Sequence, residues 1–102
     1  MRFTPRSDHG KVLASHRREI LSLARKHEFS NVRVFGSTAR GDDQARSDID
    51  LLVDRSPTSS LFDLGRFEHA VSTLLGLPVN AVPATSLKPR IAQTVLAEAI
   101  PL

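Results

Sequence analysis

The chain has 102 residues, a formal net charge of +3 and no cysteine. This length holds one domain with a modest core, the lack of cysteine excludes disulfides and thiolate metal sites, and no apolar run approaches the ~20 residues of a membrane span. The N-terminus lacks the apolar segment of a signal peptide. We therefore expect one cytoplasmic domain over residues 1–102, with residues 1–10 as a loosely ordered lead-in.

The positive charge lies in the first third of the chain. Residues 1–33 hold eight Lys/Arg against three Asp/Glu, whereas residues 34–102 hold six against eight. A basic segment is typical of a solvated helix face, and also of a surface that binds RNA or an acidic partner. All five aromatic residues are phenylalanine and they do not alternate with the basic residues. A base-stacking nucleic-acid surface is therefore not expected.

The hydrophobic pattern predicts helices and strands that alternate along the chain. Helical spacing of apolar residues occurs over residues 11–28, 61–75 and 86–99, and a short helix is predicted to begin at Ser37, a favoured N-cap residue. Apolar runs with β-branched residues predict strands at residues 31–35, 48–53 and 79–82. We expect an α/β (α+β) fold, a small mixed sheet of three or four strands with helices packed on one face.

Two carboxylates lie on one face of the second predicted strand. Because successive side chains of a strand point to opposite faces, Asp48 and Asp50 share a face, with Cα atoms about 6.6 Å apart, while Ile49 and Leu51 face the core. Two like charges repel unless a cation lies between them. Mg²⁺ is bound by one or two carboxylates together with phosphate and water oxygens. The sequence therefore predicts a Mg²⁺ site at Asp48 and Asp50.

The turn before this strand has the features of a phosphate cradle. Gly36 lets the backbone approach a ligand, and the helix that follows offers free amides to a phosphate. Ser37 adds a hydroxyl donor. Arg40 supplies a planar cation for phosphate oxygens, or alternatively forms a structural salt bridge with Asp42 or Asp48. A phosphate cradle beside a carboxylate pair indicates phosphoryl or nucleotidyl transfer.

The spacing of these two motifs resembles a known family. Gly36-Ser37, followed after ten residues by Asp48-Ile49-Asp50, resembles the signature of the polymerase-beta-like nucleotidyltransferase superfamily. The short length and the ending Leu96-Ala97-Glu98-Ala99 resemble its minimal nucleotidyltransferase (MNT) domains. The resemblance covers about residues 12–102, and it implies that Gly36 and Ser37 bind the phosphates of ATP while Asp48 and Asp50 bind Mg²⁺.

The resemblance also implies a partner. Many such short proteins are antitoxins that pair with a HEPN-domain ribonuclease toxin and neutralise it by transferring AMP from ATP to a toxin tyrosine, with release of pyrophosphate. We therefore expect a hetero-oligomer with a HEPN toxin. No membrane association is expected.

One residue departs from the family pattern. The family carries a third carboxylate on the next strand, and the alignment of Val79-Asn80-Ala81-Val82 places Asn80 there. An amide can ligate a metal weakly through its oxygen, but it cannot act as a base or add negative charge. The enzyme then works with two carboxylates, or another group such as Asp54 substitutes. The alternative is an inactive nucleotide-binding antitoxin that acts by binding its partner.

The remaining polar residues carry weaker signals. The four histidines, at positions 9, 16, 27 and 69, show no paired metal-ligand spacing and are expected at the surface or its boundary. Asp42 and Asp43 are expected in a solvated loop. A basic RNA-associated adaptor stays as a third hypothesis, supported only by the charge of the first third of the chain.

Overall fold

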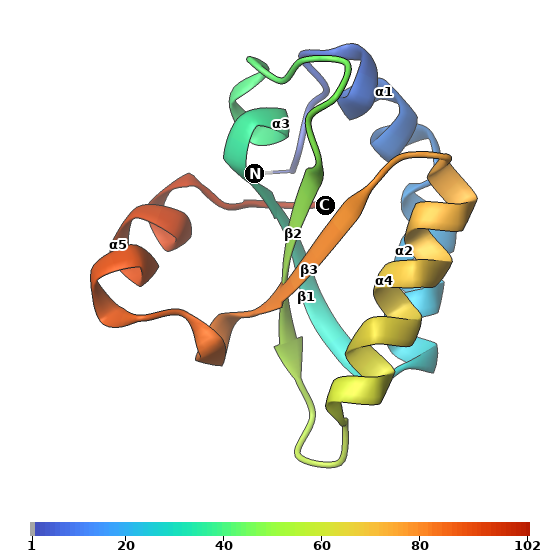
Figure 1. Cartoon of the computed structure of the whole chain (residues 1–102), viewed down its shortest axis with the longest axis vertical. Coiled ribbons are helices and arrows are strands. Elements are labelled where there is room, and N and C mark those ends of the chain that lie inside the picture. The colour runs from blue at the N-terminus through green and yellow to red at the C-terminus, as the bar shows by residue number, and fades with distance from the viewer. Residues whose placement is uncertain (1) are drawn as a thin grey trace.

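The computed structural model describes residues 2–102 (Figure 1). Its helices are α1 (Asp8–Ser15), α2 (Arg17–Lys26), α3 (Gly36–Arg40), α4 (Leu61–Leu75) and α5 (Pro89–Glu98), with a 3₁₀ turn at Ala84–Ser86. Its strands are β1 (Phe29–Phe35), β2 (Ile49–Arg55), β3 (Val79–Pro83) and β4 (Ile100–Pro101). The predicted alternation of helices and strands is confirmed, and none of the described helices is long and apolar enough to cross a membrane.

The four strands form one mixed sheet in the order β3-β2-β1-β4. β2 is antiparallel to β1 and parallel to β3, and β4 is antiparallel to β1. This register places Asp50 opposite Phe35 on one side and opposite Asn80 on the other. The predicted mixed α/β sheet is confirmed. The helices differ from the prediction in one respect, because α2 and α4 lie on one side of the strands and α5 lies on the other (Figure 1).

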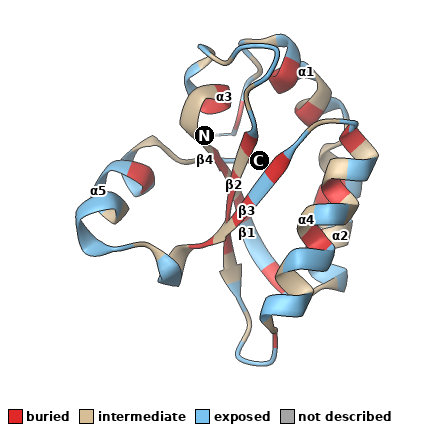
Figure 2. Cartoon of the chain, viewed as in Figure 1, coloured by how far each residue is buried: buried red, intermediate tan, exposed pale blue. Residues whose placement is uncertain are grey.

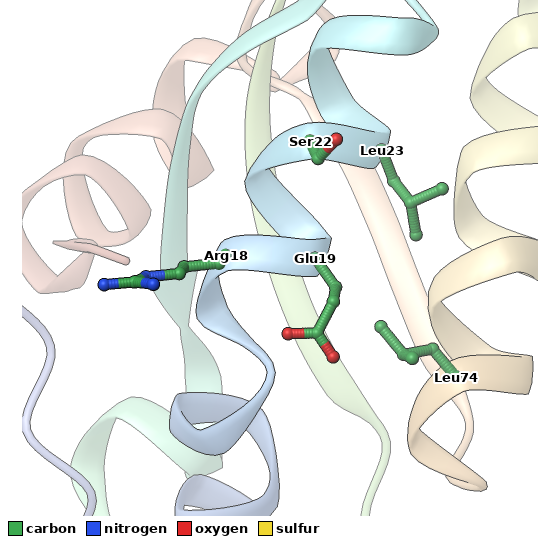
Figure 3. A pocket seen from close by; sticks show the side chains of 5 residues that line it. All are labelled: Arg18, Glu19, Ser22, Leu23 and Leu74. Carbon is green, nitrogen blue, oxygen red and sulfur yellow. The ribbon is translucent and has the colours of Figure 1, made fainter.

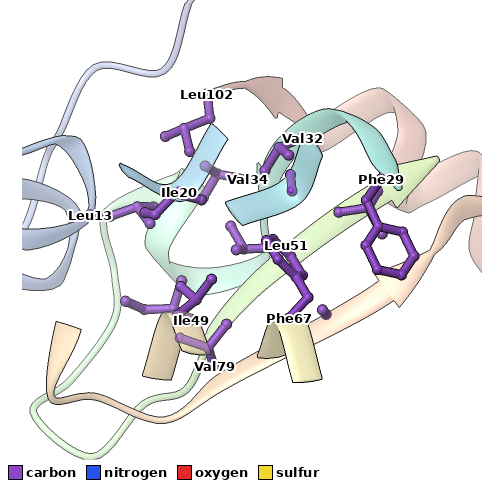
Figure 4. Packing of buried hydrophobic residues seen from close by; sticks show 14 of the residues in the cluster. Leu13, Ile20, Phe29, Val32, Val34, Ile49, Leu51, Phe67, Val79 and Leu102 are labelled. Carbon is purple, nitrogen blue, oxygen red and sulfur yellow. The ribbon is translucent and has the colours of Figure 1, made fainter. Parts of the chain in front are cut away.

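The core lies between the sheet and the helices α2 and α4. Ile49, Leu51 and Val53 alternate along β2, are fully buried, and pack in one cluster with Ile20 of α2 and Phe67 of α4 (Figure 4). Their burial is a strong source of stability because each apolar side chain removed from water contributes about 1.5–3 kcal/mol. The intervening residues of β2 face the other way, so the core fixes the direction in which Asp50 points.

Helix α4 has the bounds that the sequence predicts, because both ends carry local signals. The Ser60 hydroxyl accepts a hydrogen bond from the Asp63 amide and the Asp63 carboxylate accepts one from the Ser60 amide, which forms a capping box. At the other end Gly76 adopts φ 68°, a left-handed conformation that terminates helices. Figure 2 shows buried residues recurring along the helix face that covers the sheet.

The first third of the chain differs from the prediction. The single helix expected over residues 11–28 is broken at His16 into α1 and α2. Residues 2–10 are not a loose lead-in: Phe3 is only 5% exposed, its amide donates to the Pro101 carbonyl at 2.6 Å, and the Ser7 hydroxyl caps α1. Burial of Phe3 orders this segment against the end of the chain.

Candidate functional site

Helix α3 begins directly at the end of β1. Gly36 has φ 74°, and a Cβ at this position would lie 2.5 Å from Asp50 Oδ2, so only glycine fits this approach of the backbone to the carboxylate. The predicted N-cap is wrong, because Phe35 holds that position and its own side chain makes no capping hydrogen bond. Ser37 instead lies in the first turn. Gly36, the first residue of α3, therefore lies against the Asp50 carboxylate.

The two predicted metal ligands come together, and Asn80 lies with them. Asp48 precedes β2 by one residue and is exposed, and Asp50 is half-buried within the strand. Asn80 Nδ2 donates to Asp48 Oδ2 at 3.0 Å and to Asp50 Oδ1 at 3.3 Å. One amide group thus neutralises part of the repulsion between two carboxylates. The alignment that placed Asn80 at the site of the third carboxylate agrees with this geometry.

The environment of Asp50 favours its protonated form. Burial raises the pKa of Asp50 above its ordinary value, the hydrogen bond from Asn80 opposes that change, and the negative charges of Asp48 and Glu98 raise the pKa further. A carboxylate that is partly desolvated beside other carboxylates gains stability from a bound cation. The electrostatics of the site therefore suit a positively charged ligand.

The donor set fits Mg²⁺. Among residues 2–102, no group of three His, Cys, Asp or Glu side chains could hold a metal ion. The candidate ligands are two carboxylates, and rotation of the Asn80 amide would present its oxygen to the same point. These are hard oxygen ligands, which Mg²⁺ accepts together with water and phosphate oxygens.

Asp54 does not substitute for the third carboxylate. It lies near the other end of β2, where it pairs in register with Ser30. Its carboxylate accepts from Arg33 Nη2 at 2.6 Å and from Asn31 Nδ2 at 3.0 Å. The suggestion that Asp54 replaces the missing carboxylate is therefore wrong.

Arg40 is held between two carboxylates. Its Nε donates to Asp42 Oδ2 at 3.1 Å and its Nη1 donates to Glu98 Oε2 at 2.8 Å, and these bonds raise its pKa. The salt-bridge alternative is thus realised with Asp42 and not with Asp48. Glu98 Oε1 also accepts from the Gly36 amide at 2.5 Å. No local pattern could identify Glu98, which lies 62 residues from Gly36 in the chain.

A buried polar contact between His9 and Asp43 lies at the loop between α3 and β2. His9 Nδ1 lies 3.3 Å from Asp43 Oδ2, and the two side chains are only 10% and 2% exposed. The expectations of a surface histidine at position 9 and a solvated Asp43 are therefore wrong. The pair joins α1 to the loop that leads into Asp48.

A hollow of about 460 Å³ lies between α2 and α4, away from these groups (Figure 3). It is lined by Arg18, Glu19, Ser22, Leu23 and Leu74. Its lining combines one acid, one base and an aliphatic pair, without the convergent carboxylates of the β2 face. The sheet face at Asp50 is therefore the candidate site.

Comparisons with known proteins identify the family of the chain. Residues 16–102 match the nucleotidyltransferase domain family. The chain is 38% identical over 89 residues to the protein adenylyltransferase MntA of Thermococcus cleftensis, covering 87% of each protein. A solved structure described as a minimal nucleotidyltransferase is 43% identical, with a TM-score of 0.83 over 90% of this chain and 94% of that one.

A toxin–antitoxin structure, MntA-HepT, shares the fold. Its TM-score is 0.65 at 19% identity, and the likeness covers 85% of this chain and 68% of that one. The match of the family over residues 16–102 and the identity to MntA lead to one conclusion: the chain belongs to the nucleotidyltransferase domain family.

Proposed function

We propose that this chain is a Mg²⁺-dependent protein adenylyltransferase that transfers AMP from ATP to a hydroxyl of a partner toxin, and that it is the cytoplasmic antitoxin of that pair. The observation that supports it best is the meeting of Asp48, Asp50 and Asn80 beside the first turn of α3. The 38% identity to a protein adenylyltransferase supports the same class of reaction.

Each residue has a role in this proposal. The α3 amides, the Ser37 hydroxyl and Arg40 hold phosphate oxygens. Asp48 and Asp50 hold Mg²⁺ with help from the Asn80 amide oxygen, and the bound ion supplies charge neutralisation at the phosphates. The acceptor hydroxyl oxygen bonds to the α-phosphorus as the bond to pyrophosphate breaks. Its proton passes to solvent water, because Asp48 and Asp50 are engaged by the ion and the Asn80 amide cannot act as a base.

The acceptor is a tyrosine of a HEPN-domain ribonuclease, with which the chain forms a hetero-oligomer. The MntA-HepT toxin–antitoxin structure, which has the same fold as this chain, supports a toxin partner.

Labelled ATP, Mg²⁺ and the product of the adjacent gene test this proposal. We expect label on the partner and a mass gain of one AMP or more, and loss of both in Asp48→Ala and Asp50→Ala. Asp54→Asn is the matched control, because it changes a carboxylate on the same strand whose partners are Arg33 and Asn31. Transfer that survives the double alanine variant would exclude this site.

Tight binding of the partner without transfer would favour the alternative, an antitoxin that acts by binding alone. Asn80 is the observation behind that alternative, because an amide replaces the third carboxylate.

A further inference from the structure

The phosphate cradle of the proposed site is occupied by a carboxylate of the chain itself. Glu98 Oε1 accepts from the Gly36 amide at 2.5 Å, and Glu98 Oε2 accepts from Arg40 Nη1 at 2.8 Å. A planar anion thus bridges the first amide of α3 and the guanidinium one turn later. These two donors are among the groups that the proposed function assigns to nucleotide phosphate.

The position of Glu98 is fixed by the sheet rather than by its own helix. Glu98 is the last residue of α5, and β4 follows after one residue and pairs with Arg33 and Val34 of β1. Within α5 only Val95 is buried, whereas most of the other side chains are exposed. Helix α5 therefore makes few interactions that oppose a small shift of its C-terminal turn.

We propose that Glu98 is an internal phosphate mimic that must leave Gly36 and Arg40 when the nucleotide binds. This inference rests on the nucleotide site proposed above. A backbone amide has a single hydrogen, so the Gly36 amide cannot serve the Glu98 carboxylate and a phosphate oxygen together. Two anions on the same donors also repel each other. The need to release Glu98 therefore reduces the affinity of the chain for nucleotide.

A purely structural role for Glu98 predicts the opposite result. If Glu98 only held Arg40 in place for the phosphates, removal of its carboxylate would weaken nucleotide binding. If Glu98 competes with phosphate, removal of its carboxylate would strengthen nucleotide binding. The direction of the change separates the two roles.

The test measures binding of tripolyphosphate and of Mg²⁺ with a non-hydrolysable ATP analogue by calorimetry. We expect Glu98→Ala to bind both about threefold to tenfold more tightly than the unmodified chain, the range for a charge-assisted contact that is partly exposed. The affinity of Glu98→Gln should lie between those of Glu98→Ala and the unmodified chain. The amide oxygen of the glutamine still accepts from Gly36, but it carries no negative charge. The melting temperature of each variant shows whether it folds.

Two controls isolate the Gly36 contact. Asp42→Ala removes the other carboxylate on Arg40 but leaves the Gly36 amide occupied, so its effect should be smaller than that of Glu98→Ala. Glu19→Ala removes one negative charge from α2, away from the site, and should leave the affinity unchanged. Equal gains in all three variants would indicate a general charge effect and overturn the inference.

The amide resonance of Gly36 gives a second measurement. In the unmodified chain it should move when tripolyphosphate is added, because the acceptor of this amide changes from Glu98 to a phosphate oxygen. Binding that is unchanged or weaker in Glu98→Ala, while the unmodified chain binds nucleotide, overturns this inference and leaves the proposed function intact. Absence of binding in every variant overturns the nucleotide site and this inference with it.

Discussion

Asn80 lies directly opposite Asp50 in the parallel pair of β2 and β3, and its Nδ2 lies 3.3 Å from Asp50 Oδ1. The proposed metal site thus has an amide where we expect the family to carry a third carboxylate, and this amide donates to both Asp48 and Asp50. Compared with a carboxylate, the amide reduces the repulsion between Asp48 and Asp50 and adds no negative charge to the proposed site.

Asn80→Asp tests this exchange. We expect the variant to melt at a lower temperature than the unmodified chain in EDTA, because three carboxylates then repel one another. With Mg²⁺ it should recover its stability, bind the ion about tenfold more tightly and transfer AMP faster. Calorimetric titration of Mg²⁺ and the transfer assay check both parts. An unchanged Mg²⁺ affinity would show that Asn80 lies outside the metal site.

Asp50→Asn should stabilise the metal-free protein near neutral pH. Burial raises the pKa of Asp50 in the folded chain above its ordinary value of 3.8. The folded state therefore holds this proton more tightly than the unfolded state. The stability that results is fully present below the unfolded pKa and is lost as the pH rises through the folded pKa.

The variant should consequently gain in melting temperature on the unmodified chain as the pH rises through the folded pKa of Asp50. Melting curves across this pH range in EDTA measure the difference. Mg²⁺ should reverse the order at pH 7, because only the unmodified chain has the full ligand set. A difference that does not change with pH would contradict the raised pKa.

Gly36→Ala and Gly65→Ala form a matched pair. The first adds a Cβ 2.5 Å from Asp50 Oδ2 at a residue with φ 74°, so it should cost about 1–3 kcal/mol of stability and abolish transfer. The second adds a Cβ within α4 with no atom within 4 Å, so it should stabilise by about 0.5–1 kcal/mol. Urea denaturation and the transfer assay measure both. Transfer at the unmodified rate in Gly36→Ala would show that the site tolerates displacement of Asp50.

His9→Ala should destabilise the chain by about 1–3 kcal/mol, because it leaves the buried Asp43 carboxylate without its partner. His69→Ala is the control, since His69 is exposed on α4 and should change stability by less than about 0.5 kcal/mol. Hydrogen exchange of the loop before Asp48 should rise only in the first variant. Equal effects of the two substitutions on stability and hydrogen exchange would mean that the contact between His9 and Asp43 does not anchor this loop.

The sequence predicted the elements whose signals are local. The apolar stripe of α4 lies between a capping serine and a terminating glycine, so its bounds could be read without any tertiary information. The sequence also predicted Asp48, Asp50 and Gly36, because these residues belong to a strand-turn-helix motif with a fixed spacing. The sequence could not predict the break at His16, since the apolar spacing continues across it from α1 into α2.

The groups that the sequence missed are contacts between distant segments. Glu98 contacts Arg40, which lies 58 residues earlier in the chain, and His9 of α1 contacts Asp43 in the loop after α3. Both pairs join residues that read individually as ordinary surface charges. The two-residue strand β4 carries no pattern long enough to detect, and its pairing with β1 is what brings Glu98 to the site.

The parallel pairing of β2 with β3 also has a consequence for how the chain folds. Asp50 and Asn80 are neighbours in space but are separated by the crossover through α4, so the long loop must close before the two residues meet. Closure of such a loop loses conformational entropy before the contacts between its ends can stabilise the chain. Contacts of this kind therefore form late. We therefore expect a newly made chain to bring Asp48, Asp50 and Asn80 together late in folding, after the helices have formed.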